Sequence, residues 1–202
     1  MILVKAETIE NYVNKGWWSE QTIGHLLLHW SARRAHELAV VDPPNKFDIS
    51  GCQPEQWTWS ELLTQVGRYA AVLEAQGLRK DDIVVMQLPN CVEQHAIYLA
   101  CAISGIVVSP VPVQYRTHEL AHVMGLTQAK LAITTQHVGQ FKSAQLWADH
   151  AHQFASLKTI LSLGHTLPEG VTALAPLLLQ TPAWTAAHIK AHMTLHQVTA
   201  HD

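Results

Sequence analysis

Residues 81–134 read DDIVVMQLPN CVEQHAIYLA CAISGIVVSP VPVQYRTHEL AHVMGLTQAK LAIT. Short apolar runs at 83–88, 106–109 and 131–134 alternate with two segments, within 91–105 and at 117–127, whose apolar residues recur at helical spacing and predict helices. A short run that is apolar throughout is typical of a strand buried on both faces in a parallel sheet. The stretch therefore predicts a β-α-β-α-β unit, which sets the fold class of the whole chain.

The flanking sequence continues this alternation of helices and strands. Before the central stretch we expect a lead-in at 1–20, whose Trp17 and Trp18 dock on the core, and then a helix at 22–38. Two short strands at 38–42 and 56–59, joined by a loop at 45–55, should pair as a hairpin at a sheet edge. A helix at 60–76 should follow. After it we expect a helix at 137–155, a strand at 157–163, a loop-rich segment at 164–182 and an exposed helix at 186–198. Right-handed crossovers then predict an α/β fold with three αβα layers around a mostly parallel sheet.

Two helix starts have the spacing of a capping box. Thr58 precedes Glu61 by three positions, and Asn90 precedes Glu93 by three, each just before an apolar helical repeat. In this motif the first side chain accepts from the helix backbone and the acid reaches back. We therefore expect Thr58 and Asn90 to cap their helices.

The composition fits one domain with a face that is covered. Of the 202 residues 48% are hydrophobic and 14% are charged, against a charged fraction of roughly 25% in typical soluble proteins. The net charge is −3 and the basic residues form no run, so we expect no nucleic-acid partner. A compact domain of unusual composition is the alternative explanation. If a face is left uncovered, we expect the chain to associate with itself through 110–116 and the segment after Leu163.

The sequence also bears on membranes and compartment. Residues 96–113 carry no charge, but Gly105, Pro110 and Pro112 interrupt them, so we expect a buried helix followed by a buried strand and no transmembrane segment. The cysteines Cys52, Cys91 and Cys101 lack metal or redox spacing. Free thiols indicate a reducing compartment, and we expect a cytoplasmic protein.

Few residues offer chemistry by themselves. The sequence contains no Gly-x-x-x-x-Gly-Lys loop, no Gly-x-Gly-x-x-Gly turn and no Gly-x-Ser-x-Gly elbow. Open parallel sheets bind ligands beyond the carboxyl ends of their strands, where the loops at 88–90 and 110–116 are expected. In the second loop Gln114, Tyr115 and Arg116 would contact an anionic or amide-bearing ligand; alternatively, Tyr115 packs and Arg116 is a solvated charge.

Histidine is frequent, with 14 residues, but its spacing predicts no metal site. Residues four apart share one helix face, as in the sets His25 and His29, His118 and His122, and His188, His192 and His196. Neither pair has the glutamate of the His-Glu-x-x-His motif. Chance spacing in a histidine-rich chain explains these sets.

Several short motifs carry a family resemblance. They are GWW (16–18), TWSEL (58–62), QLPNCVE (87–93), SGIVVSP (104–110) and PVQYRTHEL (112–120). In this order and at these distances they resemble the early part of an AMP-forming acyl-CoA synthetase of the adenylate-forming ligase superfamily. The resemblance covers about residues 16–180. The motifs at 16–18 and 112–120 are similar to those of bacterial CoA ligases that act on fatty or alicyclic acids.

The resemblance implies that the parent enzyme activates a carboxylic acid with ATP and Mg²⁺ and transfers the acyl group to coenzyme A, in fatty acid metabolism. The family's phosphate loop, magnesium-binding acid and catalytic lysine lie further along and have no counterpart here. The resemblance therefore implies no catalytic residue and no tightly bound cofactor in this chain alone. It places the coenzyme A passage near Val113, Gln114 and Tyr115, with Arg116 beside them.

The resemblance also implies a domain organisation and partners. We expect a single incomplete domain at 1–202, with a lead-in helix and edge hairpin at 1–57, the core β-α-β units at 58–163, and a loop and C-terminal helix at 164–202. The expected partner is the remainder of the synthetase chain. The alternatives are a non-catalytic binding module and a subunit that completes a separate adenylating chain.

Overall fold

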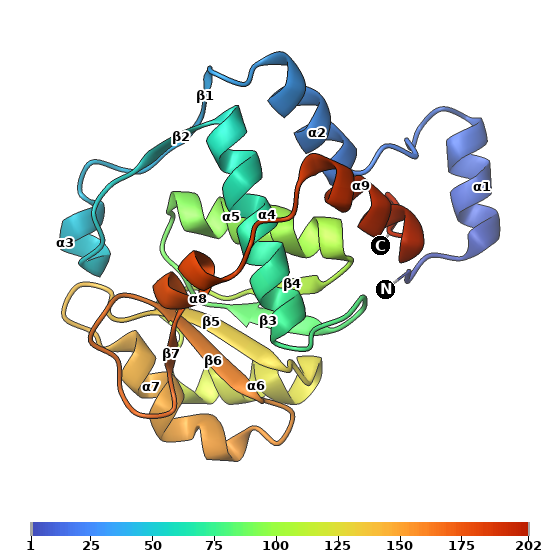
Figure 1. Cartoon of the computed structure of the whole chain (residues 1–202). Helices are drawn as coiled ribbons and strands as arrows, with labels where there is room; N and C mark the ends of the chain where they lie inside the picture. The colour runs from blue at the N-terminus through green and yellow to red at the C-terminus, as the bar shows by residue number, and fades with distance from the viewer. Residues whose placement is uncertain (1, 202) are drawn as a thin grey trace.

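A parallel sheet lies at the centre of the computed structural model, which describes residues 2–201 (Figure 1). Its strands are β3 (Ile83–Met86), β4 (Val107–Pro110), β5 (Leu131–Thr135), β6 (Thr159–Leu163) and β7 (Thr172–Ala173). Within the described residues the strand order is β4-β3-β5-β6-β7, and each neighbouring pair is parallel. The three strands predicted from the central stretch are therefore adjacent in the sheet.

Helices cover both faces of this sheet (Figure 1). One face packs against α4 (Trp59–Ala75), α5 (Val92–Ser104) and α8 (Leu174–Gln180), and the other against α6 (Thr117–Thr127) and α7 (Ser143–His150). Each face has its own apolar cluster, one around Val84 and Ile97 and the other around Val85 and Trp147. Neighbouring residues of a strand point to opposite faces, so a strand between two apolar cores needs an apolar residue at every position. The chain has the predicted three-layer α/β fold.

The remaining elements surround these layers. They are α1 (Ala6–Asn14), α2 (Ile23–Arg33), β1 (Leu38–Val41), α3 (Lys46–Ser50), β2 (Gln56–Thr58), a 3-10 turn (Ala151–Gln153) and α9 (Ala186–Leu195). The predicted pairing of the two short strands is confirmed, but β1 and β2 form a separate antiparallel sheet instead of joining the edge of the parallel one. Helices α2 and α9 pack outside α4 and α5.

The N-terminal segment departs from the sequence-based prediction in two places. Residues 1–20 contain the helix α1, and Trp17 is 66% exposed with its ring against Tyr12, so it does not dock on the core. The aromatic rings of Tyr12, Trp17 and Trp18 pack on one another instead. The expected loop at 45–55 contains α3, which ends where Gly51 adopts a positive φ of 73°.

The C-terminal third also differs from expectation. The helix predicted from His137 begins at Ser143, because residues 138–141 form a turn in which Gly139 has a φ of 57°. The loop-rich segment at 164–182 contains β7 and α8. Helix α9 is not merely exposed, since Ile189 and Met193 are buried against the core.

The charge-free segment at 96–113 divides as predicted. It is split between the end of α5 at Ser104 and the strand β4. Across residues 2–201, no helix combines the length and the apolar character that a bilayer crossing needs.

Of the two segments predicted to expose apolar surface, the one after Leu163 carries large exposed apolar side chains, Leu179 at 83% and Leu195 at 78%. Ile23 and Leu26 on α2 and Leu38 and Val41 on β1 are between 41% and 60% exposed. Residues 110–116 contribute no such side chain in the described structure. Large exposed apolar side chains therefore lie along α2 and the hairpin as well as after Leu163.

Candidate functional site

The carboxyl ends of β3 and β5 mark the point where the chain reverses its direction across the sheet. After β3 the chain moves outward to β4 through α5, and it returns to β5 on the other side of β3 through α6. Because the two crossovers cover opposite faces, this is where doubly wound sheets bind ligands. The loops predicted to bind a ligand, 88–90 and 110–116, follow β3 and β4 and so lie at this edge.

Gln87, directly after β3, ties this edge together. Its side chain is 1% exposed, and Nε2 donates to the carbonyl oxygens of Pro112 and Tyr115, both at 3.1 Å. Its Oε1 accepts from Nε1 of Trp147 on α7 at 2.8 Å. One buried amide therefore fixes the loop after β4 to the end of β3 and to a helix of the opposite layer. Sequence reasoning missed this role, although a glutamine inside an apolar strand was a signal.

The four residues predicted to line the coenzyme A passage form the surface of that loop. Val113 and Tyr115 are half-buried, whereas Gln114 and Arg116 are exposed. The Arg116 guanidinium lies 3.5 Å from the centre of the Phe141 ring and donates to the carbonyl oxygens of Val113 and Tyr115. Arg116 is therefore neither a freely solvated charge nor an open anion contact, because it folds back on its own loop.

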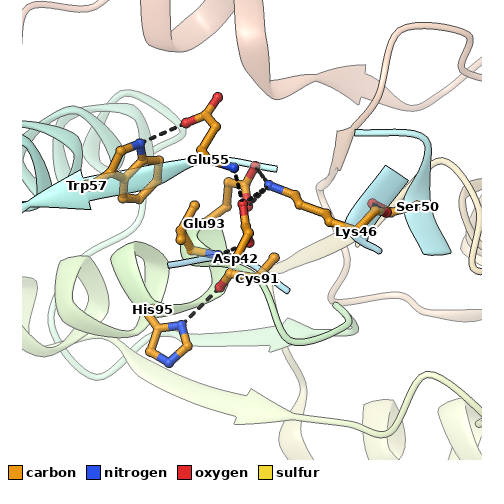
Figure 2. A network of polar contacts seen from close by, with 9 residues as sticks. Asp42, Lys46, Ser50, Glu55, Trp57, Cys91, Glu93 and His95 are labelled. Carbon is orange, nitrogen blue, oxygen red and sulfur yellow. Dashed lines mark hydrogen bonds and ion pairs between the residues drawn. The ribbon is translucent and has the colours of Figure 1, made fainter. Parts of the chain in front are cut away.

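A buried ion network holds the other side of the β3–α5 turn (Figure 2). The ammonium of Lys46 donates to Oδ2 of Asp42 at 2.7 Å and to both carboxylate oxygens of Glu93 at 2.7 and 2.8 Å. The side chains of Lys46, Asp42 and Glu93 are only 2%, 0% and 12% exposed. All three ammonium hydrogens are thus used, and two carboxylates share one positive charge.

Asp42 also replaces the helix cap that the sequence predicted. Its Oδ1 accepts from the backbone N–H of Val92 and its Oδ2 from that of Glu55, both at 2.8 Å. The prediction that Asn90 caps α5 with Glu93 is wrong: Cys91 occupies the N-cap position without a side-chain cap, and Glu93 pairs with Lys46. A carboxylate 50 positions away in sequence satisfies the helix start. The Thr58 capping box is confirmed.

The network is built for positioning, not for reaction. Burial lowers the pKa of Lys46, but hydrogen bonds to Asp42 and Glu93 more than offset this effect and leave the pKa raised above its ordinary 10.5. Burial also raises the pKa of the Cys52 and Cys91 thiols. Lys46 is therefore a fixed cation and the thiols stay protonated, so neither type of group serves as an activated nucleophile here.

Three of the histidines that share helix faces take structural roles. His25 completes the cap of α2 with Thr22, and the rings of His188 and His192 pack against Trp184. Burial and the neighbouring His196 lower the pKa of His192. Over residues 2–201 there is no group of three or more His, Cys, Asp or Glu residues arranged to hold a metal ion.

Known proteins with the same features identify the class. Residues 27–182 match the AMP-binding enzyme family, so the chain belongs to this family. A salicylyl-CoA synthase/salicylate adenylyltransferase from a Streptomyces species is 25% identical over 171 residues, which cover 85% of this chain and 29% of that protein. The 2,3-dihydroxybenzoate-AMP ligase of Bacillus subtilis is 26% identical over 78% of this chain and 28% of its own length.

Solved structures show the same fold. The apo structure of MbtA from Mycobacterium smegmatis superposes with a TM-score of 0.72 and 21% identity, over 90% of this chain and 31% of that one. The anthranilate CoA ligase AuaEII with anthranoyl-AMP gives a TM-score of 0.70 and 13% identity, over 82% of this chain and 29% of that one. The chain thus spans less than a third of the length of these relatives.

Proposed function

We propose that residues 1–202 form the first αβα unit of an AMP-forming acid–CoA ligase. In the proposed reaction a carboxylate attacks the α-phosphorus of ATP, pyrophosphate leaves, and the acyl-adenylate then passes its acyl group to the thiol of coenzyme A with release of AMP. The observation that carries this proposal is the family match over residues 27–182. It is supported by the shared fold of ligases of which this chain covers about 29–31%.

In this proposal the chain supplies scaffold and one wall of a substrate path. The sequence holds no glycine-rich phosphate loop, and residues 2–201 hold no carboxylate cluster suited to a metal ion. The residues present therefore do not fit ATP or Mg²⁺, and we assign them no bond-making step. Val113, Gln114 and Tyr115 would border the coenzyme A path, with Gln87 holding their loop in place.

The acid is proposed only as a class. Relatives are named for salicylate, for 2,3-dihydroxybenzoate and for medium-chain fatty acids. We propose a monocarboxylic acid of aromatic or aliphatic type and a protein that works in the cytoplasm. The partner of this unit is the remaining part of a ligase, whether on the same chain or on another.

A chimaera tests the proposal. Residues 1–202 would replace the matching segment of the Bacillus subtilis 2,3-dihydroxybenzoate-AMP ligase, and ATP–pyrophosphate exchange would be measured with salicylate, 2,3-dihydroxybenzoate and octanoate. We expect exchange by the chimaera and none by residues 1–202 alone. Exchange by the isolated chain, or a soluble and folded chimaera without exchange with any acid, would contradict the proposal.

A further inference from the structure

A cavity lies beside the buried ion network. It has a volume of about 500 Å³, is open to solvent on one side, and is lined by the 51–57 segment, α4, the first turn of α5, the end of β6 with the residues after it, and α8. Three of its lining residues, Glu55, Trp57 and Glu93, are drawn in Figure 2 together with Asp42 and Lys46 of the network. It is separate from the loop held by Gln87, so the ligase proposal does not account for it.

The wall of this cavity carries uncompensated negative charge. Glu55 and Glu93 both line it, and no Lys or Arg is among its lining residues. Lys46 is the cation that compensates nearby, but its three hydrogens already bind Asp42 and Glu93. Asp42 and Glu93 contact this ammonium, and with Glu55 the three carboxylates and one ammonium sum to a net charge of about −2 at neutral pH. Oε2 of Glu55 accepts from Nε1 of Trp57, which leaves Oε1 available.

Tyr69 adds a polar group without a partner. It lines the cavity and is 2% exposed, and its hydroxyl makes no hydrogen bond to any of residues 2–201. Burial, with the charges of Glu93 and Glu55 among the further causes, raises the pKa of Tyr69 well above its ordinary value. The Tyr69 oxygen is not among the fully buried polar atoms that lack a partner, although the whole residue is 2% exposed, so it is accessible from the cavity that it lines. Its hydroxyl can therefore donate to or accept from a ligand or water there.

We propose that this cavity binds the ammonium or guanidinium group of an organic cation. Such a group donates several hydrogen bonds, which the Glu55 carboxylate and the Tyr69 hydroxyl would accept, and its charge neutralises the carboxylates. An anion would meet repulsion from Glu55 and Glu93. A metal ion does not fit, since no three of the described His, Cys, Asp or Glu residues are arranged to hold one. The cation has two possible sources, a free small amine or a Lys or Arg side chain of a polypeptide.

Calorimetric titration of residues 1–202 tests this inference. The probes are agmatine, butylamine, the neutral isostere butanol and the peptide acetyl-Gly-Lys-Gly-amide. We expect saturable binding of agmatine and butylamine, weakening as salt is added, and none of butanol. Binding of the small amines alone identifies a free amine as the ligand type, whereas binding of the peptide as well identifies a basic side chain.

Matched variants locate the site. Glu55→Gln keeps an acceptor for Trp57 and should weaken agmatine binding by about tenfold or more, as expected for one charge-assisted hydrogen bond. Tyr69→Phe should weaken it about threefold or more. The control Glu74→Gln removes the same charge from an exposed position on α4 outside this cavity and should leave binding unchanged. Equal effects of Glu55→Gln and Glu74→Gln, or equal binding of butanol and butylamine, would overturn the proposal; urea midpoints confirm that each variant is folded.

Discussion

Replacing Lys46 with methionine should destabilise the fold strongly. The change leaves the carboxylates of Asp42 and Glu93 in the interior, 0% and 12% exposed, without their shared counter-charge. Removing one partner of a buried ion pair costs about 3–5 kcal/mol, chiefly because the remaining charge is uncompensated. With an m value of about 2–3 kcal/mol/M, the urea midpoint should fall by about 1–2 M.

Two companion variants separate this effect from the loss of any lysine. Lys130 pairs with Asp82 at a site where its side chain is 42% exposed, so Lys130→Met should cost only about 0–1 kcal/mol. Adding Glu93→Gln to Lys46→Met removes one of the two stranded charges, so the double variant should be more stable than the single one. A Lys46→Met variant within 1 kcal/mol of the parent, or a double variant less stable than the single, would refute the reasoning.

The same network predicts a loss of stability at high pH. The folded-state pKa of Lys46 is raised above its ordinary value of 10.5, which we take for the unfolded chain. Its contribution is therefore fully present below about pH 10.5 and is lost as the pH rises through the folded-state pKa. The stability difference between the parent and Lys46→Met, measured in urea at successive pH values, should be constant from pH 7 to about 10 and shrink above that. A difference that grows with pH would contradict the assignment.

Two further predictions concern other parts of the fold. Gln87→Leu leaves the indole N–H of Trp147 buried without its acceptor and should cost about 2–3 kcal/mol, with faster amide exchange in residues 111–116 by mass spectrometry. Gly67→Ala would place a Cβ 2.3 Å from the carbonyl oxygen of Trp184 and should lower the thermal midpoint by several degrees, whereas Gly125→Ala, with nothing within 4 Å, should raise stability by about 0.5–1 kcal/mol. If Gly67→Ala leaves the thermal midpoint unchanged, the segment around Trp184 is not held against α4.

The sequence predicted the elements whose pattern is local. The strand at Val84 and Val85 was recognisable because neighbouring residues on both faces are apolar, and each joins a different core. The helix at Thr117–Thr127 and the Thr58 cap depend on spacing within one turn, and both were predicted as they occur. Local periodicity and capping chemistry sufficed in these places.

The features that the sequence did not reveal depend on contacts between distant segments. Asp42 caps a helix 50 positions away, so no spacing rule could replace Asn90 with it. Likewise, β7 is two residues long and forms a strand because it pairs with β6 at the edge of the sheet. Helix α3 has five residues, and its Lys46 is held by two carboxylates. Glu93 is 47 positions away, and Asp42 is separated from Lys46 by Pro43 and Pro44. Tertiary context decided these elements against their local preference.

The two missed polar groups together explain how the rim of the sheet is built. Gln87 ties the end of β3 to the 111–116 loop and to α7, while Asp42 ties the start of α5 to the hairpin and to α3. Both anchors are buried and satisfied by fixed donors and acceptors, which makes each costly to open. The β3–α5 turn is therefore held from both layers by this chain's own residues, independent of any ligand. A rim preorganised in this way fits the proposal that this unit presents a fixed surface to a partner, because no binding energy is needed to order it.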